Sequence, residues 1–173
     1  MLELLRQRRS VRKFHNRSVE PEKIEQLCEA LLRSPTSRDL QPCQFVVVDD
    51  AQLLQRFASA KAHGTAFFAG APLAVVIAAD PTVSDVWIED CSIAAIIVQL
   101  AGEELGLKSC WAQLRLRLHD GETASEYVRE LVGLPVGTEV PMVIAFGYPD
   151  EEKAGHPRAS LLDEKIHRNK FSG

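Results

Sequence analysis

Residues 7–14, QRRSVRKF, concentrate positive charge in a chain that is acidic overall. The basic residues are Arg8, Arg9, Arg12 and Lys13. An arginine guanidinium binds phosphate through two parallel hydrogen bonds, and the hydroxyl of Ser10 adds a further donor. The segment is therefore a candidate phosphate-binding site. The alternative is a solvent-exposed helix end, where cations interact favourably with the helix dipole.

Two further segments carry residues suited to a small ligand. Residues 34–45, SPTSRDLQPCQF, place hydroxyl side chains and Pro42 directly before an apolar run. Small polar side chains allow a planar ligand to approach the backbone; the alternative is an ordinary connecting loop. Residues 106–117, GLKSCWAQLRLR, alternate Leu with Arg after Trp111. Their alternative interpretation is a half-exposed edge strand.

The charge distribution argues against a nucleic-acid partner. The 173 residues have a formal net charge of −4, and six of the 20 lysines and arginines lie within the first 17 residues. A nucleic-acid-binding domain usually spreads basic charge over a whole face and has a high pI. We therefore expect a local anion, such as one phosphate group, rather than a polyanion.

The cysteines and histidines form no recognisable metal-binding pattern. The four cysteines are Cys28, Cys43, Cys91 and Cys110. Their spacing matches no zinc or iron–sulfur motif, so we expect no metal and interpret them as small buried residues in a reducing compartment. No apolar run has membrane-spanning length, and the N-terminus lacks a signal-peptide core. The sequence predicts a cytoplasmic protein without a membrane contact.

Alternating helical and strand patterns place these segments in one α/β or α+β domain, with helices on both faces of a sheet. Strands are expected at residues 44–48, 73–79, 108–114 and 140–146. Helices are expected at residues 2–9, from Pro21 to about 32, from an Asp49–Asp50 cap to about 60, from a Ser84–Asp85 cap to about 105, and at 123–132. The motifs GxGxxG and GxxxxGK[ST] are absent.

The longest predicted helix is apolar on nearly every side. Residues 91–101 read CSIAAIIVQLA, and a helix that is apolar all round must be buried. A subunit interface would account for this pattern. Gly106 is expected to end the helix. Residues 150–173 are polar and weakly patterned, so we expect them to be disordered or to lie across a partner.

The order of these motifs resembles that of the nitroreductase-like flavoprotein family. The resemblance covers nearly the whole chain and rests on RRSVRKF, SPTSRDLQP, GLKSCW and FGYP. It implies an α+β fold with a central, mostly antiparallel sheet flanked by helices, in an interlocked homodimer. Residues 1–173 would form one domain, with 150–173 as a C-terminal arm that packs on the partner subunit.

The resemblance also implies FMN as the cofactor, bound at the dimer interface. Its phosphate and ribityl chain would lie on residues 8–12, with either Arg158 or Lys153 completing the phosphate site. The loop around residue 36 would approach the flavin from the other subunit. The implied cofactor-binding residues are Arg8, Arg9, Ser10, Arg12, Pro35, Thr36, Ser37, Asp39, His63, Ala112, Gln113, Leu114 and Arg158.

Two of the implied roles concern the flavin ring itself. A backbone N–H within Ala112–Leu114, near Gln113 or Leu114, would face flavin N5. His63 would lie at the pyrimidine edge and, if protonated, favour negative charge on the reduced ring; the alternative is a surface-loop histidine. The chain departs from the family pattern at Asp39, where Asn is usual, and at Cys43, where an aromatic residue is usual.

The implied function is an NAD(P)H-dependent flavin oxidoreductase. It would pass hydride from NADH or NADPH, through flavin N5, to a nitroaromatic, quinone or enone by a ping-pong mechanism, with no catalytic side chain. Two alternatives remain open. One is an FMN-binding carrier or sensor of the same fold without efficient turnover, since the chain is short and lacks an inserted segment over the substrate. The other is an unrelated module that binds a polyanion through a basic arm.

Overall fold

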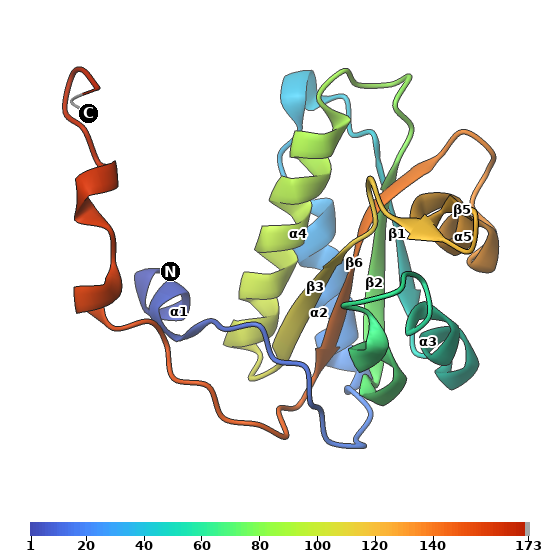
Figure 1. Ribbon diagram of the computed structural model, residues 1–173, viewed down its shortest axis with the longest axis horizontal. Helices are drawn as coiled ribbons and strands as arrows, with labels where there is room; N and C mark the ends of the chain where they lie inside the picture. The colour runs from blue at the N-terminus through green and yellow to red at the C-terminus, as the bar shows by residue number, and fades with distance from the viewer. Residues whose placement is uncertain (172–173) are drawn as a thin grey trace.

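Four antiparallel strands form the central sheet of this computed structural model, which describes residues 1–171 (Figure 1). The strands are β1 (Cys43–Val48), β2 (Leu73–Ala79), β3 (Lys108–Gln113) and β6 (Glu139–Gly147). They lie in the order β1-β2-β6-β3. A two-stranded ribbon joins β4 (Leu118–His119) to β5 (Glu122–Thr123). The predicted α+β fold with an antiparallel sheet is confirmed.

Helices cover both faces of the sheet (Figure 1). On one face, α2 (Pro21–Leu32) and α4 (Trp87–Glu104) pack on side chains such as Val75 and Ile144. On the other, α3 (Ala51–Phe57) and α5 (Ala124–Leu131) pack on Val76 and Val143. Because β2 is covered from both sides, all seven of its residues are buried. This explains why its sequence is apolar throughout instead of alternating.

Local sequence signals place most helix ends. Pro21 occupies the first turn of α2, and the Asp50 carboxylate caps α3 by accepting from the backbone N–H groups of Gln52 and Leu53. Thr123 forms a capping box with Glu126 at the start of α5. These contacts satisfy backbone donors that have no partner within the helix. The predicted boundaries at these positions are confirmed within a few residues.

The predicted cap of the longest helix is wrong. Helix α4 begins at Trp87 after Val86, which offers no side-chain cap, and the Ser84 hydroxyl instead donates to the buried Asp90 carboxylate (3.1 Å). The predicted end is confirmed. Gly106 has φ +76° and its N–H donates to the Glu103 carbonyl, while the next N–H reaches the Gly102 carbonyl. This double hydrogen bond terminates the helix.

Both chain ends extend beyond the sheet and its covering helices. Helix α1 (Leu2–Gln7) has no buried residue, and the C-terminal segment runs past it and away from the sheet (Figure 1). That segment contains two short 3-10 turns, Arg158–Ser160 and Asp163–Lys165. Large apolar side chains are exposed on α1, on α4 and along this segment: Leu2, Leu5, Ile93, Ile96, Leu161, Leu162, Ile166 and Phe171. Within residues 1–171, no helix combines the length and apolar character needed to cross a membrane.

Candidate functional site

The basic segment lies along the outer edge of β3. The Val11 N–H donates to the Ser109 carbonyl at 3.0 Å, and Ser10 and Ser109 form an isolated parallel bridge. The side chains of Val11 and Phe14 are buried, so they anchor the segment on the core. Helix α1 already ends at Gln7. The basic residues after Arg8 therefore belong to an extended segment, which favours anion binding over a helix-end role.

A carboxylate from the C-terminal side holds this segment in place. Glu151 Oε1 accepts hydrogen bonds from the backbone N–H of Arg12 (2.6 Å), from that of Lys13 (3.2 Å) and from Lys153 Nζ (2.8 Å). The hydrogen bond from the Arg12 N–H, followed in importance by the hydrogen bond from Lys153, lowers the pKa of Glu151 to about 2. The carboxylate is thus ionised at neutral pH and fixes the backbone from which the basic side chains project.

The structure distinguishes the two basic residues proposed for the C-terminal side. Lys153 Nζ donates to the Ser10 carbonyl at 2.9 Å and is about three-quarters buried. Arg158 is exposed and pairs with Asp163 at 2.8 Å. Within one chain, Lys153 is therefore part of the basic cluster and Arg158 is not brought to it.

Of the backbone N–H groups at the end of β3, the hydrogen-bond pattern of the sheet shows which one points away from the neighbouring strand. The Leu114 N–H donates to the Pro141 carbonyl at 2.8 Å, so this amide already has a partner. In an antiparallel pair, successive residues point their N–H groups alternately toward and away from the neighbouring strand. The Gln113 N–H therefore points outward from β6, on the same side as the Ser109 carbonyl. Of the segment Ala112–Leu114, Gln113 supplies the amide suited to contact a ligand.

Lys61 is a candidate site residue that the sequence analysis missed. Its Nζ donates to the Gln113 carbonyl at 2.8 Å. Burial, and next the charge of Arg117, lower the pKa of Lys61. His63 lies two residues further on and is exposed. No local motif marks Lys61, since its position depends on the loop 61–65 packing beside the end of β3.

Several cations share this edge of the sheet. Burial raises the pKa of Cys110 on β3, and the charges of Arg12, Lys153 and Lys61 act in the opposite direction. All three cations thus lie close enough to one buried thiol to act on it electrostatically. We call the segment 8–13 together with Lys61, Gln113 and Lys153 the basic edge. It combines a cluster of positive charge with an outward backbone N–H, both suited to an anionic ligand.

The loop 34–42 lies at the opposite edge, beside β1, and its backbone is strained. Arg38, Asp39 and Gln41 have φ values of 53°, 54° and 47°. Non-glycine residues rarely adopt this left-handed conformation, and each costs of order 1–3 kcal/mol. Three such residues in four positions require strong tertiary restraint. Strain of this kind is concentrated at binding sites.

Asp90 supplies part of that restraint. Its buried carboxylate accepts from the Ser37 N–H at 2.9 Å and from the Ser84 hydroxyl. Within the loop, the Gln41 N–H donates to the Thr36 hydroxyl at 3.0 Å. The Gln41 side-chain amide donates to Asp39, whereas Arg38 pairs with Asp85. Arg38 therefore does not neutralise its neighbour Asp39.

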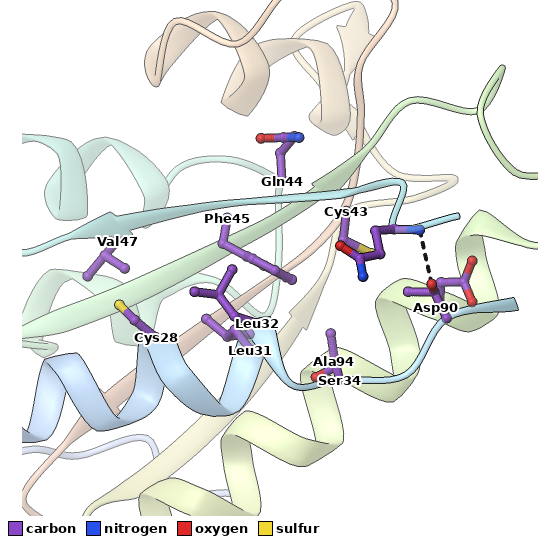
Figure 2. A pocket seen from close by; sticks show the side chains of 12 residues that line it. Cys28, Leu31, Leu32, Ser34, Cys43, Gln44, Phe45, Val47, Asp90 and Ala94 are labelled. Atoms are coloured by element: carbon purple, nitrogen blue, oxygen red, sulfur yellow. Dashed lines mark hydrogen bonds between the residues drawn. The ribbon is translucent and has the colours of Figure 1, made fainter. Parts of the chain in front are cut away.

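A pocket of about 420 Å³ opens between this loop, β1 and the helices below it. In Figure 2, Cys43, Asp90, Ala94 and Ser34 lie at one end, while α2 supplies residues at the other end facing β1. The lining residues are Cys28, Leu31, Leu32, Ser34, Thr36, Gln41, Cys43, Gln44, Phe45, Val47, Asp90 and Ala94. Cys43 therefore lies where the pocket meets the loop.

The two groups of predicted site residues are separated in one chain. The loop precedes β1, and Gln113 ends β3, at the same end of the sheet. Three strand spacings lie between β1 and β3, which is about 14 Å. Pro35, Thr36, Ser37 and Asp39 are thus not brought to the basic edge of their own chain. A second protomer would be needed to bring equivalent residues together.

Comparison with known proteins agrees with this architecture. The model of the Nitroreductase family matches residues 5–148. A solved FMN-dependent nitroreductase from Clostridium difficile is 42% identical, with a TM-score of 0.96 over 99% of this chain and 100% of its own. A protein of Archaeoglobus fulgidus, provisionally named NADH dehydrogenase/NAD(P)H nitroreductase, is 33% identical over 98% of both chains. The fold, the motif order and these matches together show that the chain belongs to the nitroreductase family.

Proposed function

We propose that this protein is an FMN-dependent oxidoreductase that passes hydride from NADH or NADPH to a small acceptor. The observation that carries the proposal is the basic edge. The cations of segment 8–13 and Lys153 lie at the start of β3, and Lys61 lies at its end, next to the residue whose N–H points outward, Gln113. The 42% identical Clostridium difficile protein is an FMN-dependent nitroreductase. Bound FMN would supply the hydride acceptor and donor, so the protein needs to bind, orient and shield it.

The basic edge fits the phosphate end of FMN. Arg8 and Arg9 are half-buried. Arg12 is exposed, and Glu151 fixes its backbone. Lys153 adds a cation whose position is set by the Ser10 carbonyl. Guanidinium groups on a restrained backbone bind phosphate with little loss of conformational freedom. We assign the phosphate contact to Arg8, Arg9, Ser10, Arg12 and Lys153, and Lys153 replaces Arg158 in this role.

The end of β3 fits the ring. The Gln113 N–H would donate to flavin N5, since the Leu114 N–H is held by Pro141. Lys61 places a positive charge on the Gln113 carbonyl at 2.8 Å, where it would offset the negative charge that reduction adds to the ring. Fixed donors and charges of this type stabilise developing charge without reorganisation. His63 remains a proposed contact at the pyrimidine edge.

We propose a homodimer because the loop 34–42 lies at the opposite edge of the sheet. In a dimer, Pro35, Thr36, Ser37 and Asp39 of the partner subunit's loop would cover the ring. The exposed apolar residues of α1 and α4 and the C-terminal arm supply the surface such an assembly requires. Association would remove this apolar area from water, which is the main driving force of obligate interfaces.

The donors of the basic edge support a class of acceptor. Within residues 1–171, the basic edge offers amide and cationic donors, which suit polarised oxygen atoms of a quinone, nitro group or enone. Reductant and acceptor would use the same open face of the ring in turn, giving a ping-pong mechanism. No side chain is required to transfer a proton in the hydride steps.

The test is reconstitution followed by turnover. Purified protein with added FMN should bind one flavin per chain, and should oxidise NADH or NADPH with a quinone, giving parallel double-reciprocal plots. Lys153→Met should weaken FMN binding while Arg158→Met, a matched control, should not. Stoichiometric FMN without turnover would instead indicate a carrier or sensor. Failure to bind FMN would refute the proposal.

A further inference from the structure

Two cysteine thiols lie in direct contact beside the strained loop. Cys43 begins β1 and Cys91 lies in the second turn of α4, with the two Sγ atoms 3.7 Å apart. All four cysteines are free. A disulfide requires an S–S distance of about 2.05 Å. A shift of roughly 1.6 Å would therefore join these two sulfur atoms.

The surroundings of the two thiols differ in a way that assigns them separate roles. Cys43 is partly exposed and lines the 420 Å³ pocket, whereas Cys91 is fully buried in the core between α4 and the sheet. The hydrogen bond between the two thiols lowers the pKa of Cys43. The same bond, and after it burial, raises the pKa of Cys91. The neighbouring Asp90 carboxylate raises the pKa of both thiols. Cys43 is thus the accessible nucleophile, with Cys91 held behind it.

We propose that Cys43 and Cys91 form a redox-active dithiol that a peroxide converts into an intrachain disulfide. This proposal does not depend on FMN binding or on the reaction proposed above. It concerns a modification site built by β1 and α4, whose two cysteines are 48 residues apart in sequence. The contact is a product of the tertiary fold.

The chemistry is balanced with hydrogen peroxide as the oxidant. The Cys43 thiolate attacks one peroxide oxygen, the O–O bond breaks, and the departing hydroxide takes a proton to become water. Cys43 is then a sulfenic acid. The Cys91 sulfur attacks the Cys43 sulfur, loses its proton, and displaces the second oxygen as water. Two thiols supply the two electrons, and one peroxide becomes two waters.

The position of the pair connects its oxidation to the loop 34–42. Cys91 directly follows Asp90, whose carboxylate holds the Ser37 N–H at 2.9 Å. Cys43 lies two residues after Gln41, the last of the three strained residues. Any backbone movement that accompanies formation of the bond takes place at the start of β1 or in the second turn of α4. Either shift acts on the anchor of the strained loop.

The experiment counts thiols in the native, reduced protein before and after hydrogen peroxide. Samples are denatured in N-ethylmaleimide and weighed by intact mass spectrometry, then digested for peptide mapping. We expect alkylation to fall from four cysteines to two, a cross-linked peptide joining Cys43 and Cys91, and full recovery after dithiothreitol. Four alkylated cysteines after peroxide, or further oxidation of Cys43 without a disulfide, would overturn the proposal.

Variants assign the sulfur atoms. Cys28 lines the same pocket, so Cys28→Ser is the matched control and should still form the disulfide. Cys91→Ser should stop disulfide formation and leave Cys43 as a sulfenic acid that dimedone traps. A disulfide that contains Cys28 would refute the assignment. If a serine variant fails to fold, the peptide map of the wild-type protein alone decides the question.

Discussion

The candidate binding residues at the two edges of the sheet are held in place by different interactions. At the basic edge, charged groups such as Glu151 and Lys153 fix the backbone through hydrogen bonds and project cations outward. At the β1 edge, a buried carboxylate holds a loop with three left-handed residues next to an apolar pocket and two thiols. One edge uses charge and the other uses strain. The first should therefore respond to salt and pH, and the second to changes in packing and backbone conformation.

The largest effect is expected at the β1 edge. Asp90→Ala removes the acceptor of the Ser37 N–H and of the Ser84 hydroxyl in a buried site. An unsatisfied buried donor costs about 1–3 kcal/mol. The Ser84 hydroxyl is buried and the Ser37 N–H is only partly buried, so we expect the free energy of unfolding to fall by roughly 2–4 kcal/mol, below the roughly 6 kcal/mol that two fully buried donors could cost. Urea denaturation measures it. The control is Asp85→Ala, which breaks the exposed pair with Arg38 and should cost less than about 1 kcal/mol. Equal losses would show that Asp90 does not anchor the loop.

The next effect separates Lys153 from Arg158, the two residues considered for the C-terminal phosphate contact. Lys153→Met removes a cation fixed beside Ser10, and we expect FMN affinity to fall about tenfold, which corresponds to roughly 1.4 kcal/mol. Isothermal titration with FMN measures this affinity. The same change at the exposed Arg158 should leave affinity within about twofold of the wild-type value. If the Arg158 variant instead lost more FMN affinity than the Lys153 variant, the phosphate contact would be assigned to Arg158 in the C-terminal arm.

The third prediction concerns Asp39, whose carboxylate would act on the FMN of the partner subunit in the proposed dimer. An ionised Asp39 near the ring would oppose the negative charge that reduction adds, and Arg38 is engaged by Asp85 instead of neutralising it. We expect Asp39→Asn to raise the midpoint potential of bound FMN. Asn also tolerates a left-handed backbone, so loop geometry should be retained. Identical potentials in a spectroelectrochemical titration would place Asp39 away from the ring.

The smallest effect is a pH dependence at the basic edge. The pKa of Glu151 is about 2, below its ordinary value of 4.5. A lowered pKa stabilises the folded state fully above the ordinary value, and this contribution is lost as the pH falls through 4.5 toward 2. The difference in unfolding free energy between wild type and Glu151→Gln should therefore shrink over that range. A constant difference would mean that Glu151 does not hold the segment through its charge.

The sequence analysis succeeded where local patterns determine structure. The apolar runs of β2 and β6, the cap at Asp50 and the helix end at Gly106 all depend on near neighbours, and all were predicted. The order of motifs was enough to indicate the family. Ser84 was misassigned because a cap and a buried hydrogen-bond partner of Asp90 look alike in sequence.

The missed features depend on distant parts of the chain. Lys61 joins the basic edge only because its loop packs on the end of β3, which is 52 residues away. The contact between Cys43 and Cys91 likewise requires β1 and α4 to meet. Leu114 could be separated from Gln113 only once the pairing with Pro141 fixed the hydrogen-bond register. Spacing along a single sequence contains none of this information.

The strand order has a consequence for how the chain is made. Strand β6 lies between β2 and β3, yet within residues 1–171 it is the last strand in sequence order. During synthesis, β2 leaves the ribosome before β6. Until residue 147 has emerged, β2 can pair only with β1 within this sheet. Its seven apolar residues then present an open edge that favours aggregation. The central sheet is therefore completed only after β6 has emerged, and a chain terminated before β6 should depend on chaperones.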